Sequence, residues 1–265
     1  MALVIVIPLV RFLQLNVENK WAKRGLMLTM MLCAAAAIGS QSRGALLALS
    51  AMFVMFWWRG HQKVVTAVVL IVLGVALVAF MPESWTARMS TIKTYDQDAS
   101  ALGRINAWYM ALNVAKSHLF GGGFMIYMPK VFAQYAPDPT DIHAAHSIYF
   151  MVLGEQGFVG LILFMLLGFF TWRSAGRLMR EGRLQPQTKW LSDLGAMSQA
   201  SLVGYFVGGA FLSLSYYDLP YNVMALVVLG CRYLDRKGWI EEEKQAALAP
   251  PPSKKPKRRL LGGAW

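Results

Sequence analysis

The sequence predicts an all-α polytopic membrane protein with about six transmembrane helices. Of its 265 residues, 56% are hydrophobic and only 15% are charged, which is too apolar for a soluble domain with one core. Basic residues give a net charge of +12, but they gather in short segments between apolar runs, a pattern that indicates membrane topology and not nucleic-acid binding. The predicted regions are N-terminal transmembrane helices (1–81), a long loop outside the membrane (82–146), C-terminal transmembrane helices (147–235) and a disordered basic cytoplasmic tail (236–265).

The N-terminal region contains apolar runs of different lengths. The run 1–15 is shorter than the about 20 residues that a spanning helix needs, so we expect it to end a span that begins earlier in a longer protein. Polar residues 40–44 separate the runs 25–39 and 45–58 into two short spans, since one helix through both would overshoot a bilayer. The next predicted span is 64–81.

The long loop should contain a helix of its own. Ser100 is a suitable N-cap, and apolar residues follow it at helical spacing until Gly121–Gly123, where we expect the helix to stop. A helix with such an apolar stripe typically lies on the membrane or covers a bundle. Loops of this length are usually functional.

The last three predicted spans are 147–170, 196–215 and 221–234. Alternate connections along the chain are basic, so the positive-inside rule places those connections and the tail in the cytoplasm. The long loop, the start of the second short span and the turn 216–220 then share the outer face. This brings together four residues that are far apart in the sequence: Arg43, Arg104, His143 and His146.

These side chains suit a phosphorylated ligand. Guanidinium groups bind diphosphate oxygens through paired hydrogen bonds and keep their charge, and histidine can take a proton from a hydroxyl near neutral pH. Arg43 also fits an arginine whose head group simply reaches the membrane interface. Glu155 lies about 13 Å inside the following helix at 1.5 Å per residue. Burying this carboxylate costs roughly 2.5–3.5 kcal/mol, so it should face a partner or a wet cavity, or be bonded at a helix break.

Metal chemistry is the alternative for this region. Asp96-Gln97-Asp98 has the D-x-D form of metal-dependent glycosyltransferases, and His143 and His146 have near-helical spacing. Neither pattern has a third ligand at a recognisable spacing, so we expect no metal and no cofactor. Gly121–Gly123 lacks the lysine of a phosphate-binding loop.

Three motifs follow one another along the chain with consistent sidedness. They are Ser42-Arg43-Gly44 between two spans, Gly103-Arg104 with Trp108 and then Gly121–Gly123, and His146-Ser147-Ile148-Tyr149 with Glu155, Gly157 and Gly160. In this order they resemble the O-antigen ligase and polymerase superfamily of bacterial inner membranes. Residues 127–130 and 135–143 are most similar to the O-glycosylation ligases associated with exosortase systems.

The resemblance implies a GT-C-like ligase fold with about twice as many spans, of which this chain lacks the first half. It implies a metal-independent, inverting enzyme that moves a glycan from an undecaprenyl-diphosphate-linked donor to a hydroxyl of a glycan, protein or lipid acceptor at the periplasmic face of the inner membrane. Arg43 and Arg104 would hold the diphosphate, and His146 would orient or deprotonate the acceptor. Four further residues are expected to contact substrate: Glu155, Arg88, His143 and Trp108.

Other functions fit parts of the pattern. An intramembrane carboxylate and interrupted spans could serve a transporter or channel for an anionic solute, although the spans show no internal repeat. A polymerase is not separable from a ligase by these motifs, and a structural subunit that supports a partner enzyme fits a chain with a missing half. The sequence leaves the oligomeric state open.

Overall fold

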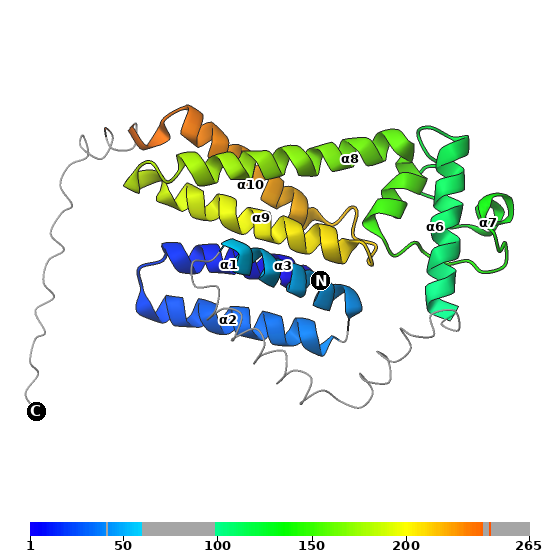
Figure 1. Ribbon diagram of the computed structural model, residues 1–265, viewed down its shortest axis with the longest axis horizontal. Coiled ribbons are helices and arrows are strands. Elements are labelled where there is room, and N and C mark those ends of the chain that lie inside the picture. The colour runs from blue at the N-terminus through cyan, green and yellow to red at the C-terminus, as the bar shows by residue number, and fades with distance from the viewer. Residues whose placement is uncertain (41, 60–98, 241–243, 245–265) are drawn as a thin grey trace, which may run out of the picture.

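The structure, a computed structural model, describes residues 1–40, 42–59, 99–240 and 244, which form helices and turns without a strand (Figure 1). The predicted span 64–81, Arg88, the Asp96–Asp98 motif and most of the basic tail lie outside the described residues. The helices are α1 (Ala2–Asn16), α2 (Lys20–Gly39), α3 (Arg43–Arg59), α6 (Ala99–Ser117), α7 (Pro129–Tyr135), α8 (Ile148–Glu181), the 3-10 turn η2 (Pro186–Thr188), α9 (Lys189–Gly209) and α10 (Asp218–Asp235).

Helix α9 lies at the centre of the bundle, where it contacts α8, α1, α3 and α10. Small residues on α9 let its neighbours approach closely, as in many membrane helix pairs. A Cβ atom at Gly195 would lie 2.5 Å from the carbonyl oxygen of Ala175 in α8. On another face of α9, the hydroxyl of Ser201 donates to the carbonyl oxygen of Ile5 in α1 at 2.8 Å. Close contact between backbones therefore adds to the buried apolar clusters that hold the bundle together.

Two described helices, α2 and α8, are long and apolar enough to cross a membrane, and α1 and α3 are shorter apolar helices. Large apolar side chains on α2 point away from the rest of the protein: Trp21 is 77% exposed and Met31 is 62% exposed. An apolar surface of this kind is expected to contact lipid. The total of about six spans remains a prediction.

The predicted separation of α2 from α3 at residues 40–44 is confirmed, because α2 ends at Gly39 and α3 begins at Arg43. Two later helices differ from the predicted spans 147–170 and 196–215. Helix α8 continues to Glu181, and Ala175 and Leu178 of its last turns are buried against α9 and α10. Helix α9 runs from Lys189 to Gly209, and the apolar Leu191 and Leu194 of its first turns pack on Leu178 near the end of α8.

Helix α6 stands across one end of the bundle, with α7 beside it (Figure 1). It begins at Ala99 and ends at Ser117, close to the predicted limits. The glycine turn 121–123 that follows docks onto α8, where its backbone N–H groups donate to the carbonyl oxygens of Gly154 and Glu155, each at 2.9 Å. The glycines thus end the helix, as predicted, and also form the joint between α6 and α8.

Helix α8 is interrupted at this joint. Gly157 has φ 70° and ψ −168°, a backbone conformation that is essentially restricted to glycine. A Cβ atom at this position would lie only 2.0 Å from the carbonyl oxygen of Leu119. Glycine is therefore required at residue 157 both by backbone geometry and by the close approach of the α6 end.

Candidate functional site

His146 lies immediately before α8 and has an unusual backbone. Its φ is +45°, which is sparsely populated for residues with a side chain and often marks a functional position. The residues on either side, Ala145 and Ser147, are each only 1% exposed. The chain thus turns sharply at His146 while both of its neighbours are packed into the protein.

Arg104 on α6 lies near enough to this histidine for its positive charge to act on it. Its Nε atom is buried and has no hydrogen-bond partner among the described residues. The pKa of His146 is lowered from its ordinary value, first by burial, then by the positive charge of Arg104 and of His143. These surroundings favour the neutral form of His146, whose imidazole can then accept a proton.

His143 is occupied by contacts with the protein. Its Nδ1 atom lies 2.7 Å from Oδ1 of Asp141, and its ring packs on Gly103, where a Cβ atom would come within 2.5 Å of Nδ1. The side chain of Asn106 fastens the same loop to α6 by donating to the carbonyl oxygens of Asp138 and Asp141, each at 2.8 Å. A substrate contact for His143 remains a prediction, and its side chain is 44% exposed.

Trp108, the next predicted substrate residue on α6, faces the protein. Its Nε1 donates to the carbonyl oxygen of Ala145 at 2.6 Å. Its ring stacks on Phe150 of α8 with 4.9 Å between ring centroids and 5° between ring planes. These contacts link α6 to the segment that carries His146, and they use the only hydrogen-bond donor of the indole.

Arg43 is the first residue of α3, and the structure describes its backbone but not its side chain. The next residue, Gly44, packs on the end of α9, where a Cβ atom would lie 3.3 Å from the carbonyl oxygen of Gly208. Gly209 in turn packs on Ile148 at the start of α8. The start of α3 and the start of α8 therefore both pack on the end of α9, at the same end of the bundle.

Glu155 is 4% exposed and has a partner, as the sequence required. The hydroxyl of Tyr216 donates to its Oε2 atom at 2.5 Å, and the amide of Gln156 donates to the same hydroxyl at 3.1 Å. The break at Gly157 predicted as the alternative explanation is also present. Sequence reasoning missed Tyr216, although it had placed the turn 216–220 on the same face as the loop.

The loop between α9 and α10 reaches His146 as well. The hydroxyl of Ser213 lies 3.5 Å from Nδ1 of His146, and the hydroxyl of Ser215 donates to the carbonyl oxygen of Ile148 at 3.1 Å. No local pattern in the sequence distinguishes these serines. They join the site because α9 and α10 pack beside α8.

The model of the O-antigen ligase family matches residues 2–165. This is more than half of the chain and includes Arg43, Arg104, His146 and Glu155. The chain belongs to the O-antigen ligase family. No curated protein matches it. The resemblance seen in the motifs is thereby confirmed at the level of the family, and the chain is an O-antigen ligase-like membrane enzyme, while the exosortase-associated subtype remains a prediction.

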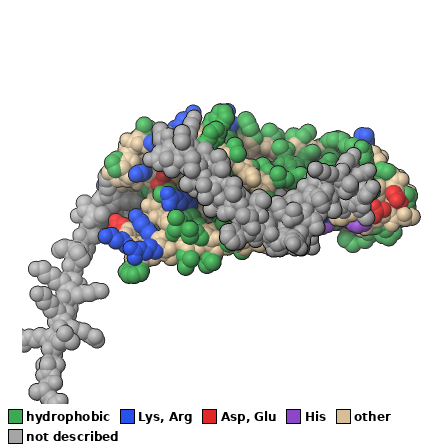
Figure 2. Space-filling view, turned by 60° about the horizontal axis from the view of Figure 1, so that its bottom comes forward, with side chains coloured by type: hydrophobic (Ala, Val, Ile, Leu, Met, Phe, Trp, Pro, Cys, Tyr) green, Lys and Arg blue, Asp and Glu red, His purple; other side chains and the backbone are tan. Residues whose placement is uncertain are grey.

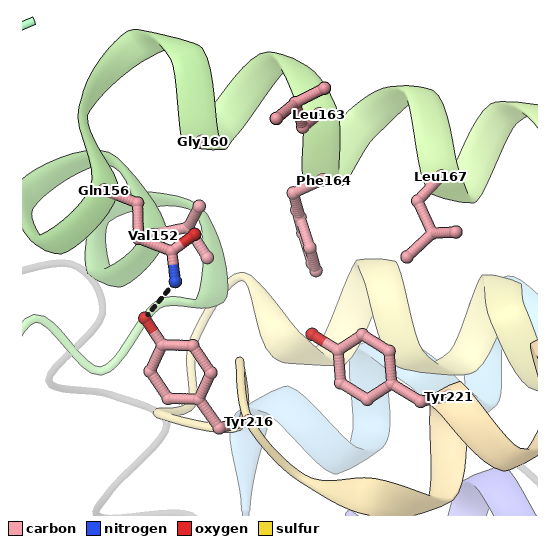
Figure 3. A pocket seen from close by; sticks show the side chains of 8 residues that line it. All are labelled: Val152, Gln156, Gly160, Leu163, Phe164, Leu167, Tyr216 and Tyr221. Carbon is pink, nitrogen blue, oxygen red and sulfur yellow. Dashed lines mark hydrogen bonds between the residues drawn. The ribbon is translucent and has the colours of Figure 1, made fainter. Parts of the chain in front are cut away.

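In this O-antigen ligase family member, a pocket of about 210 Å³ opens beside Gln156 and Tyr216, between α8 and the start of α10 (Figure 3). Gln156 and Tyr216 lie at one end of the pocket, where their hydrogen bond is drawn. The hydroxyl of Tyr221 points into the pocket from α10. Leu163, Phe164 and Leu167 of α8 form its apolar wall. The pocket thus has a polar end near Glu155 and an apolar end farther along the helix.

The two ends of the protein also differ in charge. On the face in Figure 2, most of the lysine and arginine side chains lie at the left end, whereas histidine and several acidic side chains lie at the right, where Figure 1 has α6. At the basic end, Arg177 is paired with Glu181 at 2.7 Å and with Asp235 at 2.6 Å. The end that carries Arg104 and His146 is therefore the less basic one on this face.

Proposed function

We propose that this protein transfers a glycan from an undecaprenyl diphosphate donor to an acceptor hydroxyl at the periplasmic face of the bacterial inner membrane. The observation that supports this most strongly is Arg104 next to His146, whose pKa is lowered by burial and by that positive charge. A cation that binds an anionic leaving group and a neutral base that takes a proton are the two parts that such a transfer needs.

The reaction follows from these parts. The acceptor oxygen forms a bond to the anomeric carbon as the bond between that carbon and the diphosphate oxygen breaks. The electron pair of the broken bond goes to the diphosphate, whose growing negative charge Arg43 and Arg104 stabilise in the transition state. The proton of the acceptor hydroxyl goes to His146, which contributes about 10²–10⁴-fold. Attack opposite the leaving group inverts the anomeric carbon.

The position of the site favours a lipid-linked donor. His146 precedes α8, one of the two described helices that are apolar enough to cross a membrane. A lipid chain can remain along the apolar surface of such a helix while its diphosphate reaches Arg104 at the end of the bundle. The pocket beside Glu155 adds an apolar surface next to this route.

Removal of each proposed group tests the function. In cells that lack the chromosomal gene, we expect Arg43→Ala, Arg104→Ala and His146→Ala to abolish glycan transfer without loss of membrane-inserted protein. The measurement is mass spectrometry of the glycoconjugate that disappears and of the lipid-linked precursor that accumulates. Arg24→Ala is the control, because Arg24 lies in α2 and its guanidinium packs over the ring of Trp21. Full transfer by any of the three variants would remove that residue from the site.

A further inference from the structure

His146 has a backbone conformation that residues with a side chain rarely adopt. For a residue with a Cβ atom, φ near +45° is disfavoured by roughly 1–2 kcal/mol relative to ordinary regions. The surrounding structure must therefore hold the chain in this turn. The described contacts on the two sides of His146 show which side chains do so.

We propose that Trp108 and Ser215 are positioning residues that clamp the backbone on both sides of His146 and so fix where its imidazole points. Trp108 acts on the residue before the histidine, through its hydrogen bond to the carbonyl oxygen of Ala145. Ser215 acts after it, through its hydrogen bond to the carbonyl oxygen of Ile148. The catalytic meaning of this clamp rests on the proposed function, whereas its geometry does not.

The Trp108 side of the clamp is rigid. The indole is stacked flat against Phe150, so its Nε1 is aimed by a ring that cannot easily rotate. The bond of 2.6 Å is short for an N–H donor. Trp108 lies one helical turn after Arg104 on α6, so the same helix positions both the cation and the turn that presents the base.

The Ser215 side comes from a different part of the chain. Ser215 is completely buried, and its own carbonyl oxygen accepts a hydrogen bond from the hydroxyl of Tyr221 at 2.5 Å. Two residues earlier, the hydroxyl of Ser213 reaches Nδ1 of His146. If Nδ1 carries the proton and donates to Ser213, Nε2 is left free as the base.

The clamp also determines the surroundings of the imidazole. Among the described residues, the charged or titratable groups that act on it are Arg104 from α6 and His143 from the preceding loop, and the α9–α10 loop presents the neutral hydroxyl of Ser213. When one side of the clamp is lost, the turn should relax, and the ring should become more hydrated and move away from Arg104. Both changes favour the protonated form.

The test reads His146 directly and does not need the enzyme reaction. The full-length protein in membranes is treated with diethyl pyrocarbonate, which modifies neutral imidazole, over a range of pH. Modification of His146 is quantified by fragment-ion mass spectrometry. The variants are Trp108→Phe, which keeps the stacked ring but loses the N–H, and Ser215→Ala. Tyr135→Phe is the matched control, because it removes one hydrogen bond, to His118 at 3.0 Å, from the same α6 region without touching the clamp.

In both clamp variants we expect the pH midpoint of His146 modification to rise, while Tyr135→Phe leaves it unchanged. Glycan transfer should fall by about 10–100-fold, the usual effect of a small misplacement of a reacting group. Partial unfolding would also raise the midpoint, because an unfolded imidazole has the ordinary pKa of about 6.5, so the midpoint is read only from protein that keeps its helical circular dichroism in detergent. An unchanged midpoint in both variants, or an equal rise in Tyr135→Phe, would overturn the proposal. A raised midpoint in a protein whose wild type transfers no glycan would keep the clamp and reject the proposed function.

Discussion

The two ends of the helical bundle use arginine in different ways. At the end where α8 meets α10, Arg177 donates to the carboxylates of Glu181 and Asp235. At the α6 end, Arg104 has a buried Nε without a hydrogen-bond partner among the described residues, and its neighbour His146 is kept neutral. One arginine is neutralised by its own protein, whereas the other is placed against a base.

This difference separates structural arginines from those available for a ligand. A paired arginine stabilises the contact between two helices and has little remaining capacity for an anion. An arginine that is partly buried without a partner has lost hydration, and this loss is recovered when an anion binds. The α6 end is also where backbone geometry is unusual, at His146 and at Gly157. The other end has exposed paired charges, and its one non-glycine residue with positive φ among those described is Lys237, just after α10.

The largest expected effect is loss of stability when the joint between α6 and α8 is disrupted. Gly157→Ala should destabilise the folded protein by about 3 kcal/mol or more, because it adds the strain of a glycine-only backbone conformation to a clash with the carbonyl oxygen of Leu119 at 2.0 Å. The measurement is thermal unfolding in detergent. Gly123→Ala is the control: its φ is also positive, but no atom lies within 4 Å of the added Cβ. Equal losses in the two variants would show that the joint between α6 and α8 is not closely packed.

The next effect compares the two arginines directly. Arg104→Lys keeps the charge but loses the planar fork that pairs with diphosphate oxygens, so we expect transfer to fall by about 100-fold. Arg177→Lys should leave transfer unchanged and should reduce stability by less than about 1 kcal/mol, because its ion pairs are exposed. Initial rates with membranes that contain equal amounts of protein measure the first effect, and thermal unfolding measures the second. A loss of transfer in Arg177→Lys alone would reverse the assignment of the two ends.

The smallest effect concerns pH. Because the pKa of His146 is lowered by burial, by Arg104 and by His143, its neutral form should persist below the ordinary imidazole pKa of about 6.5. Transfer should therefore rise with pH through a midpoint below that value and stay level above it. His143→Asn removes one of the two groups whose charge lowers this pKa and should move the midpoint upward. Stability should also fall as pH falls through this range, because the unfolded chain binds the proton first. Transfer rates measured from pH 5 to pH 8 give these midpoints. A lower midpoint in His143→Asn than in the wild type would contradict this electrostatic explanation.

Some features of the site could be predicted because they are local. Arg104 and Trp108 lie one turn apart on a helix whose cap and glycine stop are visible in the sequence, and α6 occupies nearly the predicted range. The need for a partner at Glu155 followed from the cost of burying a carboxylate. The identity of that partner did not follow, because Tyr216 comes from a turn far along the chain. Trp108 was expected to contact substrate, which remains a prediction; that its indole N–H also bonds the backbone next to His146 could not be predicted, because Ala145 is far along the chain.

The sequence by itself determined the helical membrane class, the separation of α2 from α3, the end of α6 at its glycines and the family to which the chain belongs. These follow from hydropathy, helix capping and short motifs, which act over a few residues. Only the tertiary structure decided that the turn 121–123 docks onto the break at Gly157, that serines and a tyrosine of the α9–α10 loop reach His146 and Glu155, and that His146 adopts a positive φ. Such features depend on contacts between segments distant in the chain, and the energy that sustains a disfavoured local conformation comes from those contacts.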